Sequence, residues 1–177
     1  MAGVGKSTTG RRVAESLGRR FVDLDDAVEV AAGRTVAEIF RTAGEAGFRE
    51  IESQVLSEVL GGLAPTVLAT GGGAVLAPGN RALLGQRSTT VWLRAGVDEL
   101  VARLTRSQVE RPLLSGDVAA NVAALDAVRR ELYAEVADVM VDVDGLDRAE
   151  VVESVLDALA TVESGVDGVV DGAEVPR

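Results

Sequence analysis

The segment Gly5-Lys6-Ser7 leads straight into a helical stretch at residues 9–17, and this junction limits what the chain can fold into. It matches the second half of the pattern G-x-x-x-x-G-K-[ST], in which a glycine-rich loop opens a helix. The backbone N–H groups of such a loop and the helix N-terminus attract phosphate oxygens. Lys6 would reach the β- and γ-phosphates of ATP, and the Ser7 hydroxyl would bind Mg²⁺. The predicted phosphate-binding loop comprises Gly3, Val4, Gly5, Lys6, Ser7 and Thr8.

The use of lysine supports this interpretation. Of the 18 basic residues, all but Lys6 are arginine. A lysine is a compact point charge on a thin stem, whereas arginine is a wide planar fork. A single lysine against that bias indicates a position where arginine would not serve. The alternative is an ordinary Gly-Lys-Ser at the start of a helix.

The start of the chain interrupts the pattern. Its first glycine would precede Met1 by one residue, and the strand that feeds the loop would lie further upstream. That strand is central to the sheet in this class of fold. Its absence would leave neighbouring strands with unpaired backbone groups, each costing about 1–3 kcal/mol when buried. We therefore expect Met1 to be an internal methionine of a natural protein that begins roughly ten residues earlier.

Strands alternate with helices along the rest of the chain, which predicts a parallel sheet covered by helices on both faces. We expect one α/β domain over residues 1–162 and a disordered acidic tail over residues 163–177. A capping box at Thr35 and Glu38 opens one helix, and Asp98 is the expected N-cap of another. The expected strands are residues 21–23, 66–69, 90–93 and 139–143. The expected helices are residues 9–17, 26–32, 35–40, 45–60, 98–106, 118–137 and 148–159, with a short one starting at 78.

Composition excludes several functions. The 177 residues include no Cys and no His, so thiolate metal sites, disulfides and imidazole chemistry are unavailable. The formal net charge of −10 disfavours nucleic acid, whose affinity for proteins comes mainly from phosphate neutralisation. No stretch approaches the ~20 apolar residues of a membrane span, and no signal peptide opens the chain. We expect a monomeric cytoplasmic protein that acts on a small anionic molecule.

Polar residues follow the predicted strands. Asp23 and Asp25 end the first strand, and Gly71, Gly72 and Gly73 end the second. Ligands of parallel sheets bind at the carboxyl ends of the strands. One of the two carboxylates can help to hold Mg²⁺ and its waters, and the other can point at an incoming hydroxyl. The alternative is helix capping by Asp25 or Asp26.

At this point the chain resembles the shikimate kinase family, over most of residues 3–142. A phosphate-binding loop is shared by many kinases, whereas the later motifs in this order and spacing are far more specific. The matching segments are Gly3-Val4-Gly5-Lys6-Ser7-Thr8, Phe21-Val22-Asp23-Leu24-Asp25, Gly44-Glu45-Ala46-Gly47-Phe48-Arg49-Glu50-Ile51-Glu52, Thr70-Gly71-Gly72-Gly73-Ala74-Val75, Arg111-Pro112-Leu113-Leu114 and Arg129-Arg130-Glu131-Leu132-Tyr133.

The resemblance implies a three-layer P-loop fold of the nucleoside monophosphate kinase type and transfer of the γ-phosphate of ATP to shikimate. It implies that Asp23 lies on the metal side and that Asp25 orients the substrate hydroxyl. Arg49 would hold the substrate carboxylate by a two-pronged hydrogen bond, with Glu52 orienting it. The alternative for Arg49 is a surface ion pair worth under about 1 kcal/mol.

Further residues are assigned by the same resemblance. The three glycines would let the backbone approach a ring with several hydroxyls, within a substrate-binding region at about residues 25–60. Arg129 would be a second carboxylate ligand, although Glu131 stands where the family's R-x-P-L-Y pattern has proline. Arg111 would close over the transferring phosphate from a lid at residues 107–117. Arg103 or Arg106 would contact adenine.

Two rival functions stay open. One is a related kinase for another small acceptor, such as a sugar acid or a nucleoside monophosphate. The other is a nucleotide-binding domain without catalysis.

Overall fold

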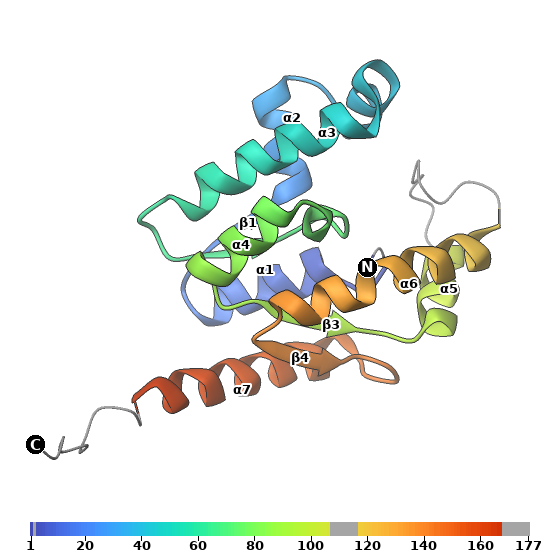
Figure 1. Ribbon diagram of the computed structural model, residues 1–177. Coiled ribbons are helices and arrows are strands. Elements are labelled where there is room, and N and C mark those ends of the chain that lie inside the picture. Colours follow the sequence, from blue (N-terminus) through green and yellow to red (C-terminus); the bar gives the residue numbers. More distant parts are fainter. Residues whose placement is uncertain (2, 107–116, 168–177) are drawn as a thin grey trace, which may run out of the picture.

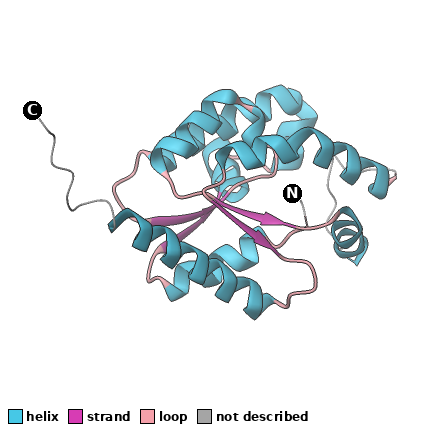
Figure 2. Cartoon of the chain, turned by 60° about the horizontal axis from the view of Figure 1, so that its bottom comes forward, coloured by secondary structure: helices cyan, strands magenta, loops and turns pink. Residues whose placement is uncertain are grey.

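The computed structural model describes residue 1, residues 3–106 and residues 117–167. Helices lie on both sides of a layer of parallel strands (Figures 1 and 2), as the sequence predicts. The strands are β1 (Arg20–Asp23), β2 (Thr66–Ala69), β3 (Val91–Arg94) and β4 (Val139–Asp142). The helices are α1 (Lys6–Ser16), α2 (Leu24–Ala32), α3 (Val36–Leu60), the 3-10 turn η1 (Ala74–Leu76), α4 (Pro78–Arg87), α5 (Val97–Arg106), α6 (Val118–Val136) and α7 (Arg148–Asp167).

The strands form two parallel pairs. β1 pairs with β2 in the register Asp23 opposite Ala69, and β3 pairs with β4 in the register Arg94 opposite Asp142. Within the described ranges, no backbone ladder joins β2 to β3. Within each pair the two strands run in the same direction. The residues that follow them therefore lie at the same edge of that pair.

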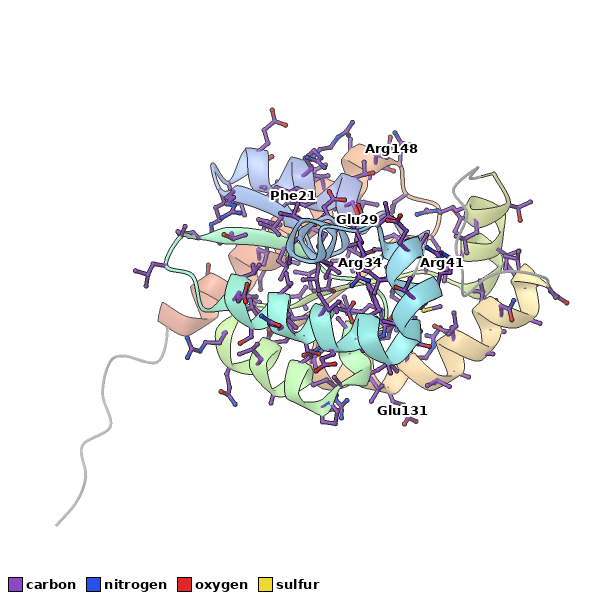
Figure 3. The ribbon with its side chains drawn as sticks, turned by 90° about the horizontal axis from the view of Figure 1, so that it is seen from above. Phe21, Glu29, Arg34, Arg41, Glu131 and Arg148 are labelled. Atoms are coloured by element: carbon purple, nitrogen blue, oxygen red, sulfur yellow. The ribbon has the colours of Figure 1, made fainter. Side chains whose placement is uncertain are left out.

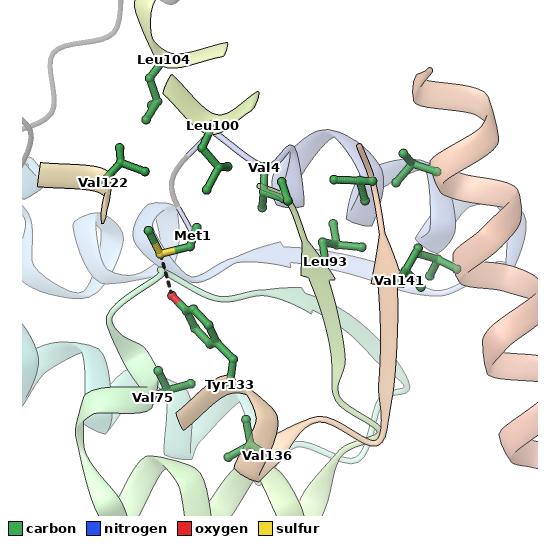
Figure 4. Packing of buried hydrophobic residues seen from close by; sticks show 14 of the residues in the cluster. Met1, Val4, Val75, Leu93, Leu100, Leu104, Val122, Tyr133, Val136 and Val141 are labelled. Carbon is green, nitrogen blue, oxygen red and sulfur yellow. Dashed lines mark hydrogen bonds between the residues drawn. The ribbon is translucent and has the colours of Figure 1, made fainter. Parts of the chain in front are cut away.

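Two apolar clusters hold these layers together. One cluster joins α1, α5, α6 and α7 to β3 and β4, and its members include Val4, Leu93, Leu100 and Val141 (Figure 4). The other lies between α2, α3 and α4 around the fully buried Leu24, Val28, Ile39 and Leu56. The second cluster therefore fixes α3, which carries Arg49, against the segment that follows β2.

Local signals account for most helix starts. Thr35 Oγ1 accepts from the Glu38 N–H at 3.2 Å, and Glu38 Oε2 accepts from the Thr35 N–H at 2.9 Å, so the predicted capping box is confirmed. Residues 35–40 and 45–60 are parts of the single element α3, which bends at Gly44 (φ 69°). α3 packs against both α2 and α4.

Three expectations at helix ends are wrong. α5 begins at Val97, and the Leu100 N–H donates to Gly96 O at 3.0 Å, so Asp98 lies inside the first turn rather than at the cap. α2 begins at Leu24 and its cap is Asp23, not Asp25 or Asp26. α7 continues to Asp167, past the predicted start of the tail at residue 163, and residues 168–177 lie outside the described part.

Candidate active site

The predicted phosphate loop has the backbone that such a loop needs. Gly5 is the N-cap of α1 with φ 99°, and Gly3 has φ 80°, both in the left-handed region that glycine favours. Val4 between them is buried, with only 2% of its surface exposed. The Thr9 N–H donates to Gly5 O at 2.9 Å and so starts the helix. The N–H groups ahead of that bond face outward at the positive end of α1.

Lys6 lies over its own loop. Its Nζ atom donates to Met1 O at 2.8 Å, across the turn formed by the glycines. The ammonium group is partly buried there. A cation held at this position lies where the loop N–H groups would bind phosphate oxygens.

Ser7 and Asp23 bring α1 and the end of β1 together. Ser7 Oγ donates to Asp23 Oδ2 at 2.5 Å, and Asp23 Oδ1 accepts from the Asp25 N–H at 3.0 Å. Hydroxyl and carboxylate oxygens suit Mg²⁺, which keeps several waters and takes further ligands from phosphates. Over the described residues, no group of three or more acidic side chains forms a metal site. This pair of oxygens therefore fits a phosphate-bound Mg²⁺ and not an all-protein cage.

Asp25 projects from the first turn of α2 and stays open to solvent. Desolvation by the surrounding protein raises the pKa of its carboxyl, and the neighbouring Asp23 carboxylate acts in the same direction. Lys6 and Arg49 oppose the change. A carboxylate with a raised pKa is a better proton acceptor than an ordinary aspartate.

The three glycines after β2 lie against the functional side chains. A Cβ atom added to Gly71 would lie 2.8 Å from Glu52 Oε1 and 3.1 Å from Asp25 Oδ1, and one added to Gly73 would overlap the Arg49 guanidinium. Gly72 O accepts from Tyr133 Oη at 2.6 Å. Close approach is thus a physical requirement at Gly71 and Gly73, because a side chain there would displace the polar groups.

Arg49 is held on α3 by acidic residues of its own helix. Its Nη1 atom donates to Glu52 Oε2 at 2.7 Å, and its Nη2 atom donates to Glu45 Oε1 at 3.1 Å. The guanidinium also lies 5.0 Å from the ring of Phe48. Its side chain is 18% exposed, whereas that of Glu52 is fully buried. The Arg49–Glu52 pair is therefore largely buried and is not a surface ion pair.

Arg129 and Arg130 face different partners because of the packing of α6. Arg129 is 6% exposed, and its Nη1 atom donates to Gly72 O at 3.1 Å. Arg130 instead pairs with Asp126 at 2.6 Å along the helix. Glu131, which replaces the proline of the motif, is exposed at the outer edge of α6 (Figure 3). That departure therefore leaves the position of Arg129 unaffected.

Tyr133 is a site residue that the sequence analysis did not single out. It follows Arg129 by four positions and so shares its helix face. Burial raises the pKa of the Tyr133 phenol, so the hydroxyl keeps its proton and donates to Gly72 O. Four-residue spacing behind a site arginine was the signal that could have found it.

Of the three arginines expected on the nucleotide side, only Arg103 has a described side chain. Arg103 on α5 donates to Glu99 Oε1 at 2.7 Å, to Val143 O at 3.2 Å and to Val4 O at 3.4 Å, which places it beside the phosphate loop. Arg106 ends α5, and its side chain is outside the described part, as is all of Arg111.

Two buried polar atoms among the described residues have no hydrogen-bond partner: Glu52 Oε1 and Arg129 Nε. Buried polar groups are nearly always paired, so each such atom needs an explanation. Both belong to side chains that contact the glycine segment 71–73. Neither atom is exposed to solvent, so the folded chain carries the desolvation cost of each.

A parallel sheet, a phosphate loop with Lys6 and Ser7, and an acidic and basic cluster at the strand ends together define a P-loop kinase. A sequence model of the family described as "Shikimate kinase" matches residues 2–160. The chain belongs to the shikimate kinase family, which confirms the resemblance found in the sequence.

Curated relatives and solved structures agree with this assignment. A shikimate kinase of Nitrobacter winogradskyi is 47% identical over 80% of this chain, which spans 65% of that relative's length. One of Halorhodospira halophila is 46% identical over 89% of this chain and 88% of its own. The structure titled shikimate kinase from Acinetobacter baumannii in complex with shikimate has a TM-score of 0.85 at 36% identity, covering 91% of this chain and 89% of that one.

A gluconokinase from Sinorhizobium meliloti is also similar, with a TM-score of 0.64 at 20% identity over 97% of this chain and 94% of that one. That likeness shows the fold alone. In the described ranges, no helix is both long and apolar enough to cross a membrane.

Proposed function

We propose that this chain transfers the γ-phosphate of ATP to a ring hydroxyl of shikimate and forms shikimate 3-phosphate. The observation that carries the proposal is the convergence of Asp25, Arg49 and Arg129 on the three glycines after β2. The substrate is an anionic ring with several hydroxyls. It needs cations for its carboxylate, open backbone for its ring, and a base for the reacting hydroxyl.

The acceptor side follows from these contacts. Arg49 and Arg129 would bind the substrate carboxylate, since arginine pairs with carboxylates through two parallel hydrogen bonds. With the carboxylate held, the ring would lie over the glycine segment and a hydroxyl would face Asp25. Asp25 would accept the hydroxyl proton as the oxygen attacks phosphorus.

The donor side is formed by the loop of residues 3–8 and Lys6. Ser7 and Asp23 would hold Mg²⁺, which neutralises negative charge on the phosphates when it is bound. Arg103 is a candidate for a nucleotide contact, because its side chain reaches Val4 O of the loop. The lid arginine Arg111 and the lid at residues 107–117 stay predictions from the resemblance.

Assembly and location are further proposals. We propose a monomer that acts in the cytoplasm, where ATP is available, with residues 25–60 as the substrate-binding region. Light scattering with and without shikimate would measure the mass of the species. A mass of two chains would contradict the monomer.

The substrate is tested by ADP release from ATP and Mg²⁺ with a panel of acceptors. We expect turnover with shikimate and none above the background with gluconate or nucleoside monophosphates. Turnover with another member of the panel alone would replace shikimate by that acceptor. Binding of ATP without turnover on any acceptor would favour a non-catalytic nucleotide-binding domain.

A further inference from the structure

The three glycines of the site are conformationally permissive, so something else must hold them in place. The segment itself has short-range bonds only: the Ala74 N–H donates to Gly71 O at 3.2 Å and the Leu76 N–H donates to Gly73 O at 3.0 Å. Both are turn bonds of η1, and neither ties the segment to another element. The remaining restraints come from side chains of α4 and α6.

Arg81 on α4 reaches the far side of the segment. Its Nη1 atom donates to Val75 O at 2.9 Å and to Leu76 O at 3.4 Å. The preceding residue, Asn80, is 4% exposed and donates to Ala74 O at 2.9 Å. Two neighbouring side chains at the start of α4 thus bind the consecutive carbonyls of η1.

Arg81 also bridges to α6. Its Nε atom donates to Glu135 Oε1 at 2.9 Å, and the arginine side chain is only 17% exposed. Within two helical turns of Glu135, α6 also contacts the glycines, because Tyr133 and Arg129 both donate to Gly72 O. Val75 and Tyr133 belong to the same apolar cluster (Figure 4).

These bonds form a closed ring. It runs from Gly72 O to Tyr133 and Arg129 on α6, on to Glu135, across to Arg81 on α4, and back through Val75 O to the glycines. Because the ring contains Arg129, its geometry sets both the path of the glycine backbone and the distance from that backbone to the arginine. The phosphate loop and Ser7 lie outside the ring.

We propose that Arg81 is a positioning residue for the acceptor side of the site, acting through the η1 carbonyls and through Glu135. The proposal rests on the proposed function, because it assigns the glycine segment to acceptor binding. A general loss of stability would weaken binding of both substrates, whereas this proposal predicts different effects on the two. Loosening the ring would weaken binding of the acceptor and leave binding of ATP unchanged.

The test compares Arg81→Gln, Arg81→Lys and Glu135→Gln with the wild-type chain. Arg87→Gln is the matched control, because Arg87 is an exposed arginine of the same helix outside the ring. We expect Arg81→Gln to raise KM for shikimate by about tenfold, as misplaced binding groups do, with KM for ATP within about twofold of wild type. Arg81→Lys keeps the charge near Glu135 with fewer donors. Its KM for shikimate should lie between those of wild type and Arg81→Gln.

Amide exchange gives a readout that does not depend on the substrate. In Arg81→Gln we expect residues 71–76 to exchange about tenfold faster while α1 is unchanged, since loss of local restraints lowers the local opening free energy. The double variant of Arg81 and Glu135 should add little to Arg81→Gln, because both belong to one ring.

Unchanged exchange at residues 71–76, or faster exchange with an unchanged KM for shikimate, would overturn the proposal. So would an equal rise of both KM values, which indicates a purely structural role. If the wild-type chain phosphorylates another acceptor instead, the proposed function fails. The ring is then judged by exchange and by KM for that acceptor.

Discussion

Arg49 donates a 2.7 Å hydrogen bond to a Glu52 carboxylate that is fully buried, while the second oxygen of the same carboxylate has no partner. Burial raises the pKa of Glu52 above its usual value of 4.5, and Arg49 only partly opposes this. A buried carboxylate with one unpaired oxygen costs free energy when it is ionised. The native protein therefore keeps this cost in place next to Arg49.

This relationship predicts a pH-dependent stability. A pKa that is higher in the folded than in the unfolded state contributes stability that is fully present below pH 4.5. This stability is lost as pH rises through the folded-state pKa. The difference in unfolding free energy between wild type and Glu52→Gln should therefore fall as pH rises above 4.5 in urea titrations. A difference that grows with pH would mean that pairing with Arg49 outweighs desolvation.

Asp25→Asn should lower kcat with shikimate by about 10²–10⁴-fold, the usual range for a general base. Binding of ATP should be unchanged. The base must be unprotonated, and its pKa is raised above the usual 3.8. As pH decreases, wild-type activity should therefore begin to fall at a pH above 3.8. Steady-state kinetics across pH measure both effects, with the exposed neighbour change Asp26→Asn as control. A wild-type level of kcat in Asp25→Asn would remove Asp25 from the chemistry.

Ser7→Ala removes the hydroxyl that bonds to Asp23 at 2.5 Å. We expect the Mg²⁺ concentration for half-maximal activity to rise by about tenfold, equivalent to ~1.4 kcal/mol of binding free energy. Ser16→Ala changes the same residue type at the other end of α1 and should leave the Mg²⁺ dependence unaltered. Equal Mg²⁺ curves for both variants would refute the metal role of Ser7.

Gly73→Ala would drive a methyl group into the Arg49 guanidinium. Displacement of that group should raise KM for shikimate by about 10–100-fold, because small misplacements of binding groups are costly. Gly85→Ala on α4 meets nothing within 4 Å and should stabilise the chain by up to about 1 kcal/mol. Kinetics and thermal unfolding of both variants check this. An unaffected KM in Gly73→Ala would show that close approach at this position is unimportant.

Arg129→Gln and Arg130→Gln make the same change at adjacent positions. Only Arg129 contacts Gly72 O, whereas Arg130 pairs with Asp126 along the helix. We expect KM for shikimate to rise by about tenfold or more in Arg129→Gln, and by less than about twofold in Arg130→Gln. The reverse order would place the second carboxylate ligand at Arg130.

Contiguous signals were predictable from the residues alone. The loop at Gly5, Lys6 and Ser7 is recognisable because its function depends on backbone N–H groups of one continuous segment. The capping box at Thr35 was readable for the same reason, since both partners lie within one turn. Helix caps that depend on where the chain leaves a strand were not predictable in this way. The sequence pattern predicted a cap at Asp98, which lies inside the first turn of α5, and none at Asp23, which caps α2.

The acceptor site was only partly predictable. Motif order and spacing indicated Asp25, Arg49 and Gly71–Gly73, because each of these residues lies in a short continuous segment that resembles the family. The sequence by itself determined the class of fold and the phosphate loop, and it predicted a set of candidate arginines for the acceptor.

Only the tertiary structure decided which members of that set meet. Arg129 rather than Arg130 faces Gly72 because the packing of α6 against η1 sets the rotation of the helix. Tyr133, and the ring through Arg81 and Glu135, depend on contacts between residues 54 to 61 positions apart. Periodicity within one helix reports which residues share a face, but it does not report what that face will touch. That depends on how separate elements pack, which is a property of the whole folded chain.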